Sequence, residues 1–285
     1  AEGADASGVR YFRDLEDYLD LEARLPHLQH LTVVGGGATA AELAGVLRAR
    51  GAQVTLVLPE EYPLFRTLPR DLGTALADHL RDLGVETVSG ETLARIEEAG
   101  GVLHARTLNG NALDTQLVLV DQGGEAQDEL AEAAGLDTDD GVVVDVLGRT
   151  SRPGVWAAGE VTEFPSPALG QLMRGEGVDH AERHGRCVGA NMAGAGQPYD
   201  HLPRRAFRIG DQRFEGVGEL SARLETETVW IEEGREGVAF YVRDDAIRGV
   251  LLVNVEGRLE WARELVRAAR AMAPGERAAL VGAKT

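Results

Sequence analysis

A glycine-rich turn directly after a short apolar run, near the start of the chain, restricts the fold more than any other feature. Residues 31–34 are apolar, as in a parallel strand covered on both faces, and Gly35 and Gly37 follow. Ala40 stands at the third position of a G-x-G-x-x-G/A pattern, where a small side chain lets a helix lie against the strand. We expect a pyrophosphate to bind the exposed N–H groups of the new helix, from Ala38 onward. Glycine turns also serve as plain connectors, so this alternative stays open for the motif alone.

The residues after the turn complete a unit of the size that nucleotide-binding folds repeat. Leu43, Val46 and Leu47 recur at helical spacing, and Gly51 is a suitable C-terminal cap. Residues 53–58 then form a second apolar run. Strand, turn, helix and strand within about 30 residues make a βαβ unit. The sequence therefore predicts an α/β fold with a Rossmann-like parallel sheet.

Two acidic residues follow the second predicted strand. A carboxylate at this point accepts hydrogen bonds from the ribose 2′-hydroxyl and repels a 2′-phosphate. Glu60 therefore predicts that NAD(H) is preferred over NADP(H), although Glu60 and Glu61 could also merely solvate a loop. Arg66, a few residues later, could still contact a phosphate.

A second constellation lies in residues 141–161. A strand ending at Gly159, with the carboxylate of Glu160 just beyond it, could hydrogen-bond a polyol or ribityl chain. The alternative is a plain buried strand and turn. We expect a helix over residues 170–192, whose two histidines, His180 and His184, lie one turn apart. A metal would need a third ligand, so we expect none.

The remaining segments carry less specific patterns. A helix from residue 68 to 83 should be followed by a β-meander with a hairpin turn at residues 109–111. From residue 201 onward the pattern predicts five antiparallel strands and one closing helix, residues 259–272.

Composition excludes several classes of protein. The net charge of −18 disfavours binding to nucleic acid or to anionic lipid. No apolar run approaches the roughly 20 residues of a membrane span. Cys187 is the only cysteine, so an internal disulfide or a dithiol relay is excluded, and we expect a cytoplasmic protein. Because the chain opens at Ala1 without a methionine, we expect it to be the later part of a longer protein.

Several motifs together resemble a known superfamily. Residues 35–42 resemble the NADH-domain fingerprint of the FAD-dependent and NAD(P)-dependent pyridine nucleotide-disulfide oxidoreductases. Residues 150–160, T-S-R-P-G-V-W-A-A-G-E, resemble the second FAD motif of that superfamily, T-S-x-P-x-I-Y-A-x-G-D. Residues 174–181, 190–199 and 237–244 resemble its apoptosis-inducing-factor-like and ferredoxin-reductase-like branch.

The resemblance implies a Rossmann-like NADH domain inserted in an incomplete FAD domain, followed by a small α+β C-terminal domain. The implied segments are residues 1–28 (linker and helix at the end of the first half of the FAD domain), 29–121 (NAD(H)-binding domain), 122–200 (second half of the FAD domain) and 201–285 (C-terminal domain). The first half of the FAD domain would precede Ala1, so we expect this chain alone not to hold FAD tightly.

The resemblance also assigns site residues. The residues matched to the NADH side are Gly35, Gly37, Ala38, Ala40, Glu60, Arg66 and Gly123. Those matched to the flavin side are Gly159, Glu160 and Glu176. Glu42 corresponds to an acid near the nicotinamide and flavin, and its alternative role is that of an acid favoured by the helix dipole.

This chain departs from the family pattern on the flavin side. Glu160 replaces an aspartate, and Gly177 and Ala206 stand where the branch has a flavin-contacting histidine and a tryptophan. Residues 123–127, G-G-E-A-Q, replace a G-x-x-P-N segment.

The resemblance implies an NADH-dependent flavoprotein oxidoreductase that transfers a hydride from NADH to FAD. The electrons would then pass to a small-molecule or protein acceptor, and a homodimer is one assembly that we consider. The alternative is a non-catalytic NAD(H)-binding or partner-docking protein on a degenerate reductase scaffold, since the substitutions lie on the flavin side.

Overall fold

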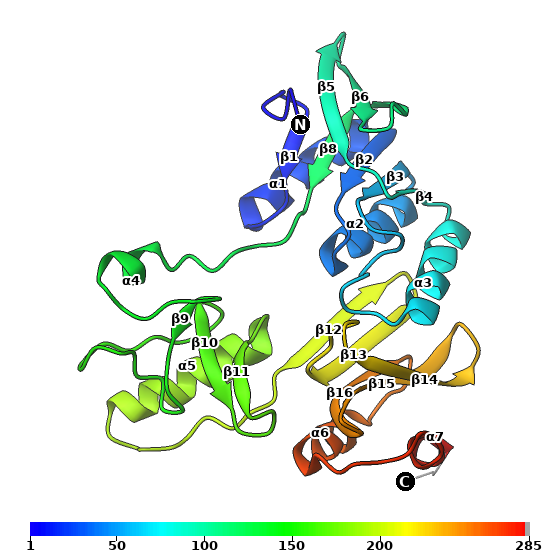
Figure 1. The fold of residues 1–285 in the computed structure, drawn as a ribbon. Helices are drawn as coiled ribbons and strands as arrows, with labels where there is room; N and C mark the ends of the chain where they lie inside the picture. The colour runs from blue at the N-terminus through cyan, green and yellow to red at the C-terminus, as the bar shows by residue number, and fades with distance from the viewer. Residues whose placement is uncertain (283–285) are drawn as a thin grey trace. The chain divides into compact units, whose positions relative to one another are not determined.

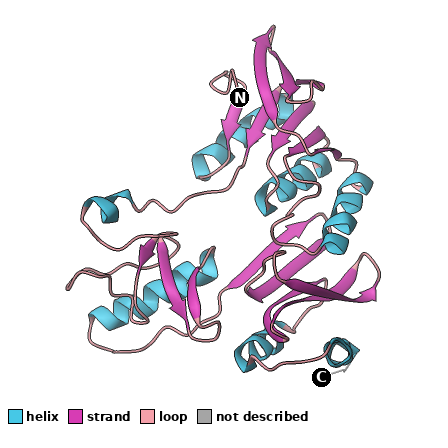
Figure 2. Cartoon of the chain, in the orientation of Figure 1, coloured by secondary structure: helices cyan, strands magenta, loops and turns pink. Residues whose placement is uncertain are grey.

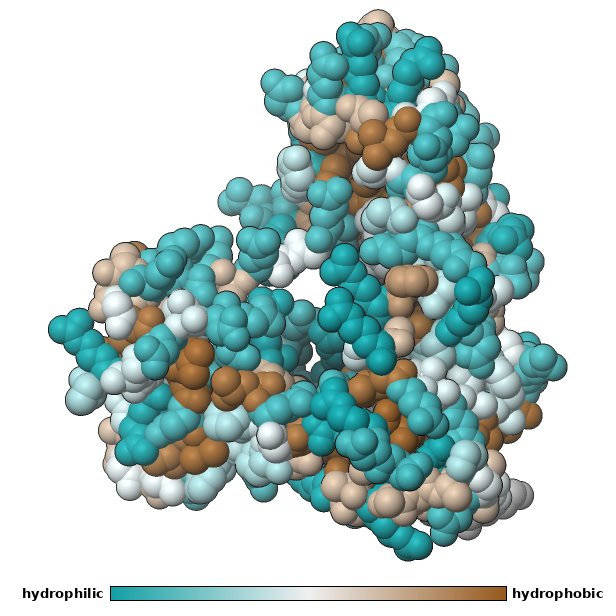
Figure 3. Space-filling model, viewed as in Figure 1, coloured by the Kyte–Doolittle hydropathy of each residue, from teal (hydrophilic) through white to brown (hydrophobic). Residues whose placement is uncertain are grey.

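The computed structural model describes residues 1–282 and divides into two compact units (Figures 1 and 2). Unit 1 comprises residues 1–123 and 207–213, and unit 2 comprises residues 124–206 and the chain from 214 onward. Hydrophilic residues dominate the face drawn in Figure 3, in keeping with a chain that is 27% charged. None of the helices within residues 1–282 is long and apolar enough to cross a membrane.

Unit 1 is built on a five-stranded parallel sheet with the order β1-β8-β2-β3-β4 (Figure 1). Its strands are β1 (Val9–Tyr11), β2 (His30–Val34), β3 (Gln53–Leu58), β4 (Glu86–Ser89) and β8 (Leu117–Val120). The predicted apolar runs form β2 and β3, where Val33 and Leu56 are fully buried, as expected for central parallel strands. The Rossmann-like α/β prediction is thereby confirmed.

Three helices accompany this sheet. They are α1 (Leu15–Arg24), α2 (Ala38–Ala49) and α3 (Arg70–Asp82), and a short 3₁₀ turn, η1 (Leu25–His27), follows α1. Helix α1 starts at a capping box made by Asp14 and Asp17. The residues before α1, expected to be a linker, include the edge strand β1.

A separate antiparallel sheet completes unit 1. It consists of β5 (Leu93–Ala99), β6 (Val102–Thr107) and β7 (Ala112–Thr115). The hairpin predicted at residues 109–111 is confirmed, because it joins the antiparallel strands β6 and β7. The expected meander is wrong at both ends. Its first strand, β4, pairs in parallel with β3, and β8 pairs in parallel with β1 and β2, since its apolar residues are buried in the main sheet.

Unit 2 begins with a small three-stranded sheet and one long helix. Its elements are α4 (Glu129–Ala133), β9 (Val142–Val143), β10 (Thr162–Ser166), β11 (Gln171–Arg174) and α5 (Val178–Met192). The helix expected over residues 170–192 starts only at Val178, because residues 171–174 pair with β10 as an antiparallel strand. Gly159 and Glu160 lie in the turn before β10 rather than at the end of a strand.

The C-terminal part agrees closely with its prediction. Five strands follow in the order β12-β13-β16-β15-β14, with the bounds β12 (Arg204–Ile209), β13 (Gln212–Gly218), β14 (Glu225–Glu232), β15 (Glu236–Arg243) and β16 (Ala246–Val253). Helix α6 (Leu259–Ala268) packs on this sheet through Ala262 and Val266, in one core with Phe240 and Val250. It ends earlier than expected because Ala269 adopts a left-handed conformation, and α7 (Pro274–Gly282) follows.

Candidate functional site

The turn between β2 and α2 requires glycine at its first position. Gly35 has φ +152°, and a Cβ there would overlap the backbone carbonyl oxygen of Asp121. Its N–H donates to the carbonyl oxygen of Val57 at 2.9 Å, which fixes the turn against β3. Ala40 is fully buried beside it, as the predicted small third position requires. The turn at Gly35 therefore has the geometry that lets its own backbone approach a ligand closely.

The start of helix α2 is left open. Gly37 is its N-cap residue, and no side chain caps the helix. The atom nearest to a Cβ built on Gly37 would be Asp121 Oδ2, at 3.9 Å, so no described protein atom crowds this position. The N–H groups of the first turn, beginning at Ala38, are available to an anion, which the helix dipole also favours.

Glu60 lies just beyond the end of β3 and has an unsatisfied oxygen. Its Oε2 atom is buried, has no hydrogen-bond partner among the described residues, and packs against Gly36. Oε1 is 3.8 Å from Nε of Arg66, whose side chain is 87% exposed. A buried carboxylate oxygen without a donor indicates a missing partner. The neighbouring Glu61, in contrast, is paired with Arg70.

Glu42 lies on α2 and is engaged within unit 1. Its Oε1 accepts the backbone N–H of Arg208 at 2.7 Å. Burial raises the pKa of Glu42, and the hydrogen bond from Arg208 opposes this shift. The assignment of Glu42 to the nicotinamide and flavin remains a prediction.

The second glycine turn, in unit 2, is closed by two histidines of α5. The N–H of Gly159 donates to Nδ1 of His184, at 3.2 Å, and the carbonyl oxygen of Gly159 lies 3.2 Å from Nε2 of His180. Thr162 Oγ1 donates to the same carbonyl at 2.7 Å, while Tyr199 Oη lies 3.0 Å from Nδ1 of His180. Both polar groups of Gly159 are therefore satisfied within the protein.

The two histidine rings are buried and neutral. Burial lowers the pKa of each to about 4, and for His184 the neighbouring His180 lowers it further. Their ring centroids are 5.0 Å apart, and the ring of Phe164 stacks on His180 at 4.7 Å. Within residues 1–282 no group of three potential ligands surrounds them. These rings hold Gly159 in place, a role that the sequence analysis missed.

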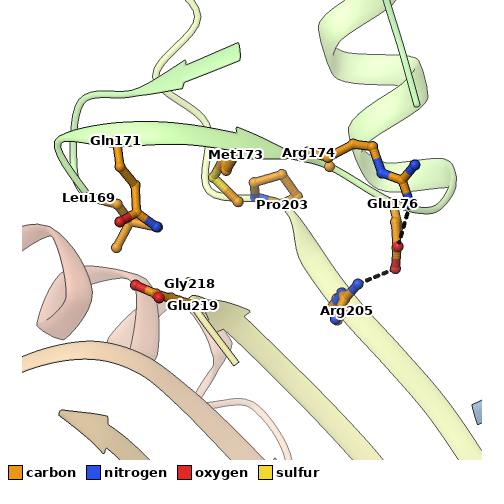
Figure 4. Close-up of a pocket in the computed structure, with 10 residues that line it drawn as sticks. Leu169, Gln171, Met173, Arg174, Glu176, Pro203, Arg205, Gly218 and Glu219 are labelled. Atoms are coloured by element: carbon orange, nitrogen blue, oxygen red, sulfur yellow. Dashed lines mark hydrogen bonds and ion pairs between the residues drawn. The ribbon is translucent and has the colours of Figure 1, made fainter. Parts of the chain in front are cut away.

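Glu176 lines a pocket of about 180 Å³ in unit 2 (Figure 4). Its carboxylate is paired with Arg205 and with Arg174, whose Nη2 lies 3.2 Å from Oε1. Burial raises the pKa of Glu176, but the two guanidinium groups outweigh burial and lower it. Glu219 lies at the opposite side of this pocket, where it is paired with Arg243 and Arg248.

The structure thus divides the predicted residues between the units. In unit 1 they lie in or near segments that follow the carboxyl ends of β2, β3 and β8, which meet at one edge of the parallel sheet. This group comprises Gly35, Gly37, Ala38, Ala40, Glu42, Glu60, Arg66 and Gly123. The group in unit 2 comprises Gly159, Glu160 and Glu176. Sequence reasoning missed Asp121, although its position directly after the apolar strand β8 was a usable signal.

Comparisons with known proteins agree with this geometry. The family described as pyridine nucleotide-disulphide oxidoreductase matches residues 1–185. Monodehydroascorbate reductase 5 of Oryza sativa subsp. japonica is 31% identical over 218 residues, covering 75% of this chain and 44% of its own length. The ferredoxin–NAD(+) reductase component of the biphenyl dioxygenase system of Paraburkholderia xenovorans is 29% identical over 270 residues, covering 93% of this chain and 65% of its own length.

A solved structure is similar over almost the whole chain. The ferredoxin reductase for the CYP199A2 system of Rhodopseudomonas palustris superposes with a TM-score of 0.89 at 28% identity, covering 98% of this chain and 69% of that one. The chain thus spans about 44% to 65% of the length of these two curated relatives.

Proposed function

Because the chain belongs to the pyridine nucleotide-disulphide oxidoreductase family, we propose that unit 1 binds NADH and that the protein acts as an NADH-dependent flavoprotein oxidoreductase. The reaction would be hydride transfer from NADH to FAD, followed by electron transfer to an acceptor. The observation that carries the NADH site is the unpaired, buried Oε2 of Glu60 beside the open glycine turn.

Two open groups in unit 1 would have counterparts in NADH. The uncapped first turn of α2, with Gly37 and Ala38, would bind the pyrophosphate, because its N–H groups and dipole favour an anion. The carboxylate of Glu60 would accept the hydroxyls of the adenosine ribose. A 2′-phosphate would place negative charge beside Glu60, so NADH is favoured over NADPH.

The flavin side offers fewer open groups. FAD, when bound, would supply the acceptor for the hydride. The residues we propose for it are Gly159, Glu160 and Glu176. Glu160 is exposed, and α5 has Gly177 as its N-cap residue and no side-chain cap among the described residues. Both are therefore open to a hydroxyl-bearing or phosphate-bearing chain. Gly159 would contribute close approach only, since its N–H and carbonyl are already bonded.

A second candidate is a non-catalytic NAD(H)-binding protein. It is supported by the closed state of Gly159 and by the two arginines that fix Glu176. The two candidates differ in one measurement on the native protein. A reductase should carry flavin whose visible absorbance is bleached by NADH, whereas the second candidate should bind NADH and remain colourless.

The nature of the acceptor and of the assembly is also a proposal. Ferredoxin reductases among the relatives support a redox-protein acceptor, and monodehydroascorbate reductases support a small one. We propose the domain bounds 29–121, 122–200 and 201–285, a cytoplasmic location and, as one assembly, a homodimer.

The NADH site is tested by Gly37→Val. The Cβ of the new side chain would meet no described protein atom closer than 3.9 Å, so we expect the fold to persist while the pyrophosphate position is blocked. We expect NADH affinity, measured by fluorescence titration, to fall at least 30-fold, on the order of 2 kcal/mol. Gly189→Val on the exposed face of α5 is the control and should leave the affinity unchanged. Equal NADH affinities for Gly37→Val and the unmodified chain would refute this site.

A further inference from the structure

The loop between β3 and α3 is fastened to the glycine turn of unit 1. The N–H of Leu64 donates to the carbonyl oxygen of Gly36 at 2.7 Å. The carbonyl oxygen of Leu64 in turn accepts the N–H groups of Thr67 and Leu68, each at 2.8 Å. This loop therefore lies directly beside the turn that we propose binds the pyrophosphate.

The backbone of this loop is strained at one residue. Leu64 has φ +56°, in the left-handed region that is unfavourable for a residue with a Cβ. Its side chain is buried, whereas the next two side chains, Phe65 and Arg66, are exposed. Conformations of this kind persist where several contacts fix them, and they are frequent at ligand sites.

Phe65 is an exposed aromatic ring backed by a buried one. It is 41% exposed, and its ring centroid lies 4.9 Å from that of Tyr62, which is 6% exposed. Tyr62 is itself held against Gly73 of α3, where any Cβ would overlap the tyrosine ring. Phe65 thus presents an apolar face at a fixed position.

We propose that Phe65 forms the surface on which the adenine ring of NADH stacks, an inference that rests on the proposed NADH site. The next residue, Arg66, reaches to 3.8 Å from Glu60, the carboxylate that would bind the adenosine ribose. Adenine is joined directly to that ribose. The flat, uncharged ring of Phe65, the residue before Arg66, is therefore suited to contact a purine. Stacking of a base on an aromatic side chain is favourable for any base with a π-face.

The test compares ligands that carry adenine with one that lacks it. Phe65→Ala should weaken binding of NADH and of ADP-ribose about tenfold each, and should leave reduced nicotinamide mononucleotide unaffected. Phe65→Trp should retain or improve NADH affinity, because it keeps an aromatic face. Tyr18→Ala, which removes another exposed ring of unit 1 (45% exposed), is the matched control and should change neither affinity.

The outcomes separate this inference from the proposed function. If the unmodified chain does not bind NADH, the proposed site itself is wrong. If it binds NADH and Phe65→Ala binds NADH and ADP-ribose equally well, adenine stacking is refuted while the NADH site stands. An equal loss for reduced nicotinamide mononucleotide would also refute stacking, since it would mean that the loop supports the whole site. Thermal unfolding of each variant identifies any that fails to fold. If Phe65→Ala fails to fold, Phe65→Trp and Phe65→Leu are compared instead. Weaker NADH binding by Phe65→Leu than by Phe65→Trp would support stacking, and equal binding would refute it.

Discussion

The two glycine turns of this molecule differ in what happens to their polar groups. In unit 1 the turn at Gly35 leads to a helix without a side-chain cap among the described residues, and Glu60 beside it has a buried oxygen without a hydrogen-bond partner there. In unit 2 the turn at Gly159 has both its N–H and its carbonyl bonded to residues of the protein, chiefly His180 and His184. The backbone groups of Gly159 are thus bonded within the protein, although Nε2 of His184, like Oε2 of Glu60, is buried without a hydrogen-bond partner among the described residues.

We expect the closed turn to contribute mainly to folding stability and the open turn mainly to ligand binding. Polar groups that the protein satisfies contribute to folding, whereas groups left open in a formed site raise the free energy of the unliganded protein and favour a ligand. The comparison therefore predicts that substitutions at the closed turn lower stability. Substitutions at the open turn should lower affinity with little change in stability.

The largest effect of a single substitution should come from His180→Ala at the closed turn. This change removes a fully buried ring that packs on Phe164, and with it the contacts of this ring to the Tyr199 hydroxyl and to the Gly159 carbonyl oxygen, which keeps only Thr162 Oγ1. We expect the free energy of unfolding, from urea titration, to fall by about 3–4 kcal/mol. His104→Ala, at a half-exposed histidine, is the control and should cost less than about 1 kcal/mol. A loss of this small size for His180→Ala would mean that the closed turn does not depend on the rings.

Lowering the pH should also reduce folding stability through the closed turn. The pKa of His180 and of His184 is lowered to about 4 in the folded protein, below the roughly 6.5 of an unfolded histidine. The unfolded chain therefore binds more protons as the pH falls, so stability is complete above pH 6.5 and is lost progressively down to about pH 4. The loss should be roughly 3 kcal/mol for one ring, read from urea midpoints at each pH.

The assignment of this acid window can be checked with His184→Gln. The amide cannot titrate, so the slope of stability against pH between 6.5 and 4 should become about half as steep. An unchanged slope would place the titration elsewhere in the molecule.

The open turn could be predicted from the sequence because its requirements are local. Gly35 needs a positive φ, Ala40 must be small, and Glu60 must follow the next strand, all within one βαβ unit. The strands of the C-terminal sheet were predictable for a similar reason, since each shows a local apolar pattern bounded by turn residues.

The closed turn could not be predicted in the same way. Gly159 meets His180 and His184 only because β10 and α5 pack together, and no local pattern distinguishes these rings from surface or cofactor-facing histidines. The same limit explains β11: residues 171–174 form a strand because β10 lies beside them, although their spacing also suits a helix. The pairing of Glu176 with Arg205 likewise depends on tertiary contact across 29 residues.

The smallest change in stability should come from Glu60→Gln at the open turn. The carboxylate has one oxygen without a hydrogen-bond donor, and its nearest cation, Arg66, is largely exposed, so the fold gains little from the charge. We expect the free energy of unfolding to change by less than about 0.5 kcal/mol. NADH affinity should fall about tenfold, because a charged acceptor forms the stronger hydrogen bonds with ribose hydroxyls. The ratio of NADH to NADPH affinity should fall as well, since the amide no longer repels a 2′-phosphate.

Glu61→Gln, at the neighbouring acid that is paired with Arg70, is the control and should leave both affinities unchanged. If Glu60→Gln instead lowered stability by 2 kcal/mol or more and left NADH affinity intact, the open turn would be a structural element like the closed one, and the contrast between the two would fail.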